Sequence, residues 1–74
     1  MEELDAIRER LKKHRLSFVW LITQLRYKGI LTDKTEVSSV FAGTRSGAKA
    51  DAIVQTTKYI LDDYEQGKVA VHEQ

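Results

Sequence analysis

Cysteine and proline are both absent from this chain of 74 residues. Without cysteine, neither a disulfide nor a thiolate metal site can stabilise the fold. His14 and His72 lie far apart with no other histidine or cysteine at ligand spacing, so we expect no zinc site. No apolar run approaches the roughly 18 residues that a membrane span needs, and the acidic start (Met1, Glu2, Glu3) does not resemble a signal peptide. We therefore expect a cytoplasmic protein with no metal, cofactor or membrane partner.

The chain is also too short for two hydrophobic cores. A domain of this size buries only about 60% of the surface that its unfolded chain exposes. We expect one domain over residues 1–67. The remaining segment, 68–74, has no clear hydrophobic period and is predicted to be a C-terminal tail.

The net charge of +1 is small, but the charges are unevenly distributed. Residues 26–49 carry five basic and two acidic side chains, whereas residues 50–66 carry one basic and four acidic side chains. A polyanion such as a phosphate backbone would therefore meet the middle of the chain and be repelled by its last helix.

Four segments have the spacing of amphipathic helices, and no segment alternates apolar and polar residues for long. This pattern predicts an all-α fold, a compact bundle of four or five helices. The apolar stripes are Leu4, Ile7 and Leu11 in the first segment, Phe18, Leu21, Ile22 and Leu25 in the second, Val37, Val40 and Phe41 in the third, and Ile53, Thr57, Ile60, Leu61 and Tyr64 in the fourth.

The ends of the second and third helices are marked by capping residues. Ser17 can cap the second helix, which should end near Gly29. Asp33, followed three residues later by Glu36, has the form of a capping box, and Gly43 offers a left-handed stop. The third helix is then shorter than the ~12 residues at which an isolated helix becomes even marginally stable, so packing must hold it in place.

Two segments together resemble the helix-turn-helix of phage regulators of the lambda repressor and Cro type. The first, "LKKHRLSFVWLITQL", places Leu16 and Ser17 before Leu21 and Leu25 in the family's order. The second, "TEVSSVFAGTRSG", has the frame of the recognition helix, an apolar residue, two polar ones, an apolar pair and a glycine stop. The turn between them is lengthened by five residues relative to the family, and Ile30 or Leu31 should pack beneath it.

The resemblance implies sequence-specific binding of double-stranded DNA by a small phage or prophage transcriptional regulator, with the third helix in the major groove. Side chains on the outer side of this helix would face the base edges, and basic or hydroxyl side chains around it would hold the backbone. The expected base contacts are Lys34, Thr35, Ser38 and Ser39. The expected phosphate contacts are Ser17, Arg26, Lys28, Thr44, Arg45, Ser46 and Lys49. The alternative for Ser17 is a plain helix cap, which is compatible with phosphate contact, and Arg26 and Lys28 also suit the dipole at the end of their helix. For the residues of the third helix and for Arg45 the alternative is a solvated surface side chain.

A homodimer is expected, because one such module rarely binds DNA strongly enough alone. Tyr59, the tail and the pair Phe18 and Trp20 are candidate dimer surfaces. An alternative function is a protein-binding adaptor or antagonist on a helix-turn-helix-like scaffold, with Phe18, Val19 and Trp20 as the contact surface. Taken individually, Trp20 and Tyr27 are assigned to packing, which is the commoner role of an aromatic residue at helical spacing.

Catalytic chemistry finds little support in the sequence. Ser38 and Ser39 have no histidine nearby, and no glycine-rich phosphate loop is present. The carboxylates of Asp62, Asp63 and Glu65 suit a solvated acidic face. We therefore expect that the protein is not an enzyme.

Overall fold

The structure, a computed structural model, describes residues 2–67. This part of the chain consists of four helices, namely α1 (Glu2–Lys13), α2 (Phe18–Tyr27), α3 (Lys34–Ala42) and α4 (Ala48–Glu65). The residues described contain no strand, so the predicted all-α class is confirmed. The predicted tail at 68–74 lies outside the described residues. No helix within residues 2–67 is long and apolar enough to cross a membrane.

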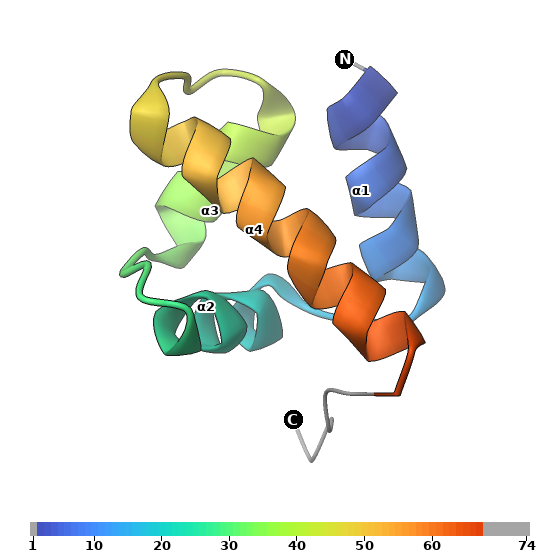
Figure 1. Cartoon of the computed structure of the whole chain (residues 1–74). Coiled ribbons are helices and arrows are strands. Elements are labelled where there is room, and N and C mark those ends of the chain that lie inside the picture. Colours follow the sequence, from blue (N-terminus) through green and yellow to red (C-terminus); the bar gives the residue numbers. More distant parts are fainter. Residues whose placement is uncertain (1, 68–74) are drawn as a thin grey trace.

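The longest helix, α4, runs diagonally across the front of the molecule in Figure 1, with α1 to its right and α2 below. The nine-residue α3 lies behind the upper half of α4 and packs against all three other helices. This packing explains how a helix too short to be stable alone is held in place.

One hydrophobic core lies between the four helices and includes every apolar stripe predicted from the sequence. Among residues 2–67, Thr57 is the one buried residue of polar type, and its hydroxyl donates to the Ile53 carbonyl oxygen at 2.7 Å, which satisfies the donor within α4. The buried apolar residues are Leu4, Ile7, Leu11, Leu16, Trp20, Leu21, Leu25, Val37, Val40, Phe41, Ala50, Ile53, Val54, Ile60 and Leu61.

The lengthened turn starts with a left-handed residue that closes α2. Gly29 has φ of 92°, and its N–H donates to the Arg26 carbonyl oxygen at 2.9 Å. The next N–H, that of Ile30, reaches back to the Leu25 carbonyl oxygen at 2.9 Å. This geometry folds Ile30 onto the core and leaves Leu31 exposed, so Ile30 is the residue that packs beneath the turn.

Both predicted N-terminal caps are formed. Ser17 Oγ accepts a hydrogen bond of 3.0 Å from the Trp20 N–H, and Asp33 Oδ1 accepts one of 2.7 Å from the Glu36 N–H. The α3 cap makes only half of the predicted capping box, because the Glu36 carboxylate bonds to other groups. These caps set the starting points of α2 and α3.

Candidate nucleic-acid interface

The outer side of α3 carries the residues that the sequence assigns to base contacts. Lys34, Thr35 and Ser38 are exposed, and Ser39 is half-buried, while Val37 and Val40 point into the core. The hydroxyl-rich side of this helix therefore faces solvent, as the helical spacing predicts.

The Glu36 carboxylate lies on α3 beside this surface and joins the helix to three other segments of the chain. One oxygen, Oε1, accepts a hydrogen bond of 2.6 Å from the Thr32 hydroxyl and lies 3.0 Å from Lys49 Nζ. The other oxygen, Oε2, lies 3.5 Å from Arg45 Nη1. The pKa of Glu36 lies below its ordinary value. The hydrogen bond from Thr32 is the largest cause of this shift, and the contact with Lys49 is the next. The lengthened turn, α3, the following loop and the start of α4 thus meet at one carboxylate.

Besides Arg45, the loop after α3 carries two predicted phosphate contacts, Thr44 and Ser46, and of these only Thr44 is bonded to the helix in the described part of the chain. Gly43 has φ of 83°, which lets the Thr44 N–H and hydroxyl both donate to the Ser39 carbonyl oxygen, at 3.0 and 3.1 Å. Both donors of Thr44 are therefore used in hydrogen bonds to the last turn of α3. Ser46 is exposed and forms no side-chain hydrogen bond within residues 2–67.

The start of α4 follows a glycine in a conformation that other residues rarely adopt. Gly47 has φ of 114° and ψ of −178°, and α4 receives no side-chain cap there. The first N–H groups of this helix consequently remain available to an acceptor, next to the exposed side chain of Lys49.

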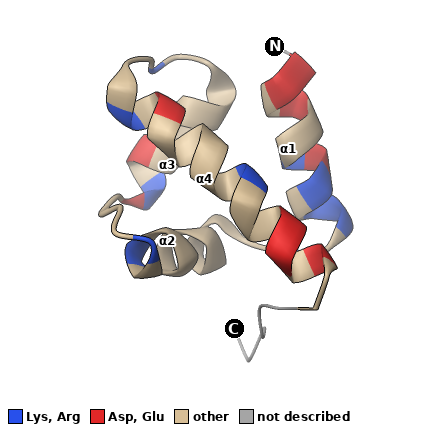
Figure 2. Cartoon of the chain, in the orientation of Figure 1, with Lys and Arg blue, Asp and Glu red and all other residues tan. Residues whose placement is uncertain are grey.

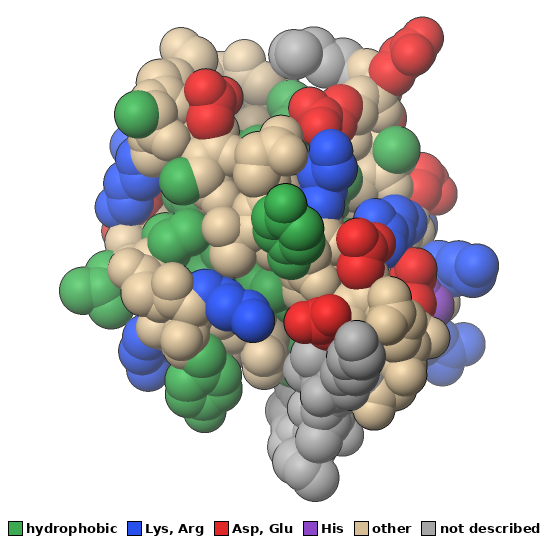
Figure 3. All heavy atoms as spheres, in the orientation of Figure 1, with side chains coloured by type: hydrophobic (Ala, Val, Ile, Leu, Met, Phe, Trp, Pro, Cys, Tyr) green, Lys and Arg blue, Asp and Glu red, His purple; other side chains and the backbone are tan. Residues whose placement is uncertain are grey.

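The remaining predicted phosphate contacts lie on α2. Ser17 is exposed at its start, and Arg26 and Lys28 are exposed at its end. Figure 2 shows basic residues at the end of α2 and at the starts of α3 and α4, all toward the left of the view. Figure 3 shows basic side chains along that edge, whereas acidic side chains gather over the lower half of α4.

The packing role assigned to Trp20 is confirmed, whereas the alternative partner surface with Phe18 and Val19 offers little accessible area. Trp20 is only 6% exposed and meets Tyr64 edge to face, with ring centroids 5.8 Å apart. Phe18 is half-buried and stacks on Phe41, so Val19 alone of the three is exposed. The reason is that the lower end of α4 passes close to the first turn of α2 and covers the indole.

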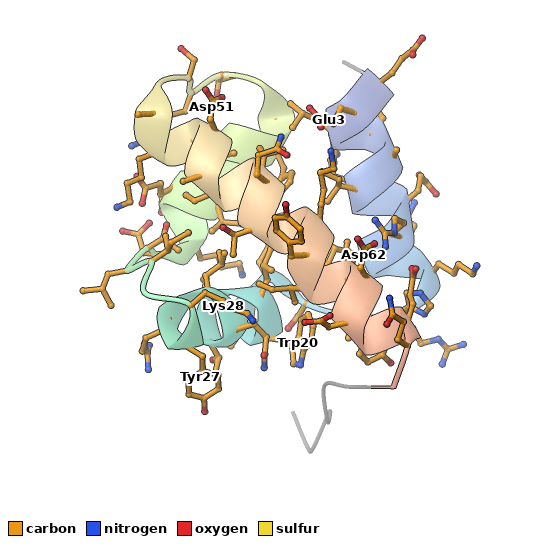
Figure 4. The ribbon with its side chains drawn as sticks, in the orientation of Figure 1. Glu3, Trp20, Tyr27, Lys28, Asp51 and Asp62 are labelled. Atoms are coloured by element: carbon orange, nitrogen blue, oxygen red, sulfur yellow. The ribbon has the colours of Figure 1, made fainter. Side chains whose placement is uncertain are left out.

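Tyr27, in contrast, does not pack in the core. It is 75% exposed, and Figure 4 shows it pointing away from the body of the molecule, on the opposite side of α2 from α4. Of the candidate dimer surfaces, Tyr59 is exposed on α4, whereas Phe18 and Trp20 offer little accessible area.

The acidic residues at the end of α4 are not simply solvated. Arg10 on α1 donates to Asp62 Oδ1 at 2.8 Å and to Glu65 Oε1 at 3.0 Å, and His14 Nε2 lies 3.0 Å from Glu65 Oε2. Figure 4 shows Asp62 on the side of α4 that faces α1. Asp62 and Glu65 are exposed, as the assignment to a solvated face expects, but their ion pairs also join the two helices. None of these contacts could be found from local spacing, because the partners lie more than 50 residues apart.

Comparison of the sequence with known protein families finds no match, and no curated protein or solved structure matches the chain either.

Proposed function

We propose that this protein binds double-stranded DNA in a sequence-specific manner, as a small transcriptional regulator of the phage repressor type. In this proposal α2 and α3 act as a helix-turn-helix, and α3 enters the major groove. The observation that carries the proposal is the exposed flank formed by Lys34, Thr35 and Ser38, on a helix whose Glu36 pairs with Arg45 of the following loop and Lys49 of α4.

Each group on this flank has a chemistry that suits a base edge. The hydroxyls of Thr35 and Ser38 can donate to or accept from several bases, and the Thr35 methyl can contact the methyl group of thymine. Lys34 can reach a guanine or a phosphate. Because none of these groups is bidentate, part of the discrimination should come from the shape of the DNA.

Phosphate contacts would be made on both sides of α3. Arg45, Ser46 and Lys49 lie in or after the loop that follows it, and the uncapped start of α4 adds free N–H groups. In this proposal Ser17, Arg26 and Lys28, at the two ends of α2, supply the contacts to the backbone on the other side. A single module of this kind buries about 600 to 1,000 Å² on DNA, so we expect it to bind as a homodimer on a two-fold site.

Selection from a random duplex library tests base reading directly. The wild-type protein should enrich a defined sequence, and Thr35→Ala or Ser38→Ala should change the preference at one or two positions. Thr56→Ala, on α4, is the control and should leave the selected sequence unchanged. If wild-type protein enriches no sequence and retains no duplex at 50 mM salt, a level at which phosphate contacts are strong, the proposal is wrong.

Salt dependence tests the phosphate contacts. Lys49→Ala should flatten the slope of log affinity against log salt by about one unit, because one phosphate contact is lost. Lys13→Ala removes the same charge from the end of α1, and we expect it to change the slope much less.

A protein-binding adaptor is the second candidate, and exposed apolar residues favour it. Val19 and Tyr27 on α2, and Leu31 in the lengthened turn, are each more than half exposed. Apolar and aromatic side chains of this kind commonly anchor protein interfaces. For an adaptor, Tyr27→Ala would abolish capture of a protein partner, and duplex DNA would not compete with that partner.

A further inference from the structure

Glu36 presents an anion to two of the basic residues that are candidates for phosphate contact. Its carboxylate lies 3.0 Å from Lys49 Nζ and 3.5 Å from Arg45 Nη1. A carboxylate and a phosphate both offer anionic oxygens, and Lys and Arg bind either kind of oxygen at similar distances. The carboxylate therefore occupies the cations that a phosphate would need.

The three side chains differ in burial, and this difference decides whether a phosphate can replace the Glu36 carboxylate at the two cations. The Glu36 side chain is only 15% exposed, while those of Arg45 and Lys49 are about half exposed. Solvent, and hence another anion, can reach both cations without moving α3. Their long and flexible side chains can turn outward, and the contact with Arg45 is already at the long end of the ion-pair range.

Thr32 keeps the carboxylate in place when the cations leave. Its hydroxyl donates to Glu36 Oε1 at 2.6 Å, and Asp33 holds the Glu36 N–H at 2.7 Å. Both contacts come from the lengthened turn and do not involve the loop or α4. The acidic group therefore stays near the interface whether or not Arg45 and Lys49 are paired with it.

We propose that Glu36 is an internal competitor of the DNA phosphates. It pairs with Lys49 and Arg45 in the free protein, and it releases them when these side chains bind the DNA backbone. This inference rests on the proposed function, DNA binding by the α3 surface. Glu36 thereby sets how strongly the protein binds any duplex and how steeply that binding depends on salt.

The main test compares Glu36→Gln with the wild-type protein on one selected duplex. Gln keeps the shape of the side chain and can still accept from Thr32, so the local structure should persist. Removing the competitor should tighten binding about three- to fivefold at low salt, which is the scale of one exposed ion pair. The salt slope should become steeper by up to about one unit, since Lys49 no longer exchanges one anion for another.

Two controls separate competition from a general effect of net charge. Glu9→Gln removes the same charge from the exposed face of α1 and should tighten binding much less. In a Lys49→Ala background, Glu36→Gln should give a clearly smaller gain than in the wild-type protein, because the two effects share a partner. Equal gains in both backgrounds would overturn the inference.

A measurement on the wild-type protein avoids any problem with the folding of a variant. The ¹³C signal of the Glu36 carboxyl group should shift on addition of the duplex, as Lys49 leaves it, while that of Glu9 should stay in place. If the protein binds DNA but Glu36→Gln binds equally or more weakly and the Glu36 signal does not move, the inference fails and the proposed function stands. If neither protein binds duplex DNA, both fail.

Discussion

Arg10 on α1 holds Glu65 at the end of α4 through two hydrogen bonds, of 3.1 Å from Nε and 3.0 Å from Nη2. His14 adds a third contact to the same carboxylate at 3.0 Å. These contacts lower the pKa of Glu65 from 4.5 to about 2. The hydrogen bonds from Arg10 are the largest cause, and the contact with His14 is the next. The two helices at the ends of the described chain are therefore joined by a group that stays ionised well into the acid range.

This pairing predicts a loss of stability in acid. The pKa of Glu65 is lower in the folded protein than its ordinary value of 4.5, so its stabilising contribution is complete above about pH 4.5 and disappears as the pH falls toward 2. The pKa values of Glu3, paired with Lys58, and of Glu36 are lowered in the same direction. Urea unfolding curves measured between pH 7 and 2 should show the midpoint falling over this window.

Glu65→Gln should make the midpoint less dependent on pH between about 4.5 and 2, since the titrating partner of Arg10 is gone. Asp63→Asn is the matched control, because the Asp63 side chain makes no ion pair within residues 2–67. A Glu65→Gln protein with the same acid sensitivity as Asp63→Asn would contradict the role assigned to this ion pair.

The helices and their buried faces could be predicted from the sequence because both depend on local spacing. Val37, Val40 and Phe41 repeat at helical intervals, and Asp33 and Gly43 mark the ends of α3 through their own backbone and capping preferences. The same local information predicted that Thr35 and Ser38 face solvent.

Contacts between distant segments could not be predicted in this way. Glu36 was expected to complete the cap of its own helix, but its carboxylate bonds to Thr32, Lys49 and Arg45, and the last two lie nine or more residues away. Helical spacing favoured packing for Trp20 but could not name its partner, because that depends on where α4 crosses α2, and no spacing within α2 reports that. The crossing positions of the helices are set by the packing of the whole core.

The core predicts that the same change, valine to alanine, has very different effects on stability at two positions. Val37 is fully buried between α3 and its neighbours, whereas Val19 is 62% exposed on α2. Val37→Ala should lower the free energy of unfolding by about 2 to 3 kcal/mol, from lost burial and the cavity that remains. Val19→Ala should change it by less than about 0.5 kcal/mol. Chemical denaturation at pH 7 measures both, and similar losses would show that α3 is not packed as described.

The cap of α3 can be tested with two substitutions of Asp33, one that removes the capping oxygen and one that keeps it. Asp33→Ala removes the acceptor for the Glu36 N–H and should cost about 0.5 to 2 kcal/mol of stability, whereas Asp33→Asn keeps an oxygen in the same place and should cost much less. Hydrogen exchange of the amides at the start of α3 gives a local measurement of the same effect. Faster exchange in Asp33→Ala alone is the expected result, and equal exchange in the two variants would show that the cap does not hold this helix.

Arg15 ends α1 in a backbone conformation that favours glycine. Its φ is 57°, and its N–H donates to the Lys12 carbonyl oxygen at 3.0 Å while the Leu16 N–H reaches the Leu11 carbonyl oxygen at 2.9 Å. This is the same turn that Gly29 makes at the end of α2, but here a side chain bears the steric cost of a left-handed residue, about 1 to 2 kcal/mol.

Arg15→Gly should therefore raise the stability of the protein. The relief of strain exceeds the extra chain entropy of glycine, about 0.5 to 1 kcal/mol, so a net gain of roughly 0.5 to 1 kcal/mol is expected. Arg15→Ala removes the same charge but keeps the Cβ atom, and it should bring no comparable gain. Thermal unfolding of the three proteins decides the point, because a gain shared equally by both variants would assign the effect to the lost charge and not to the backbone.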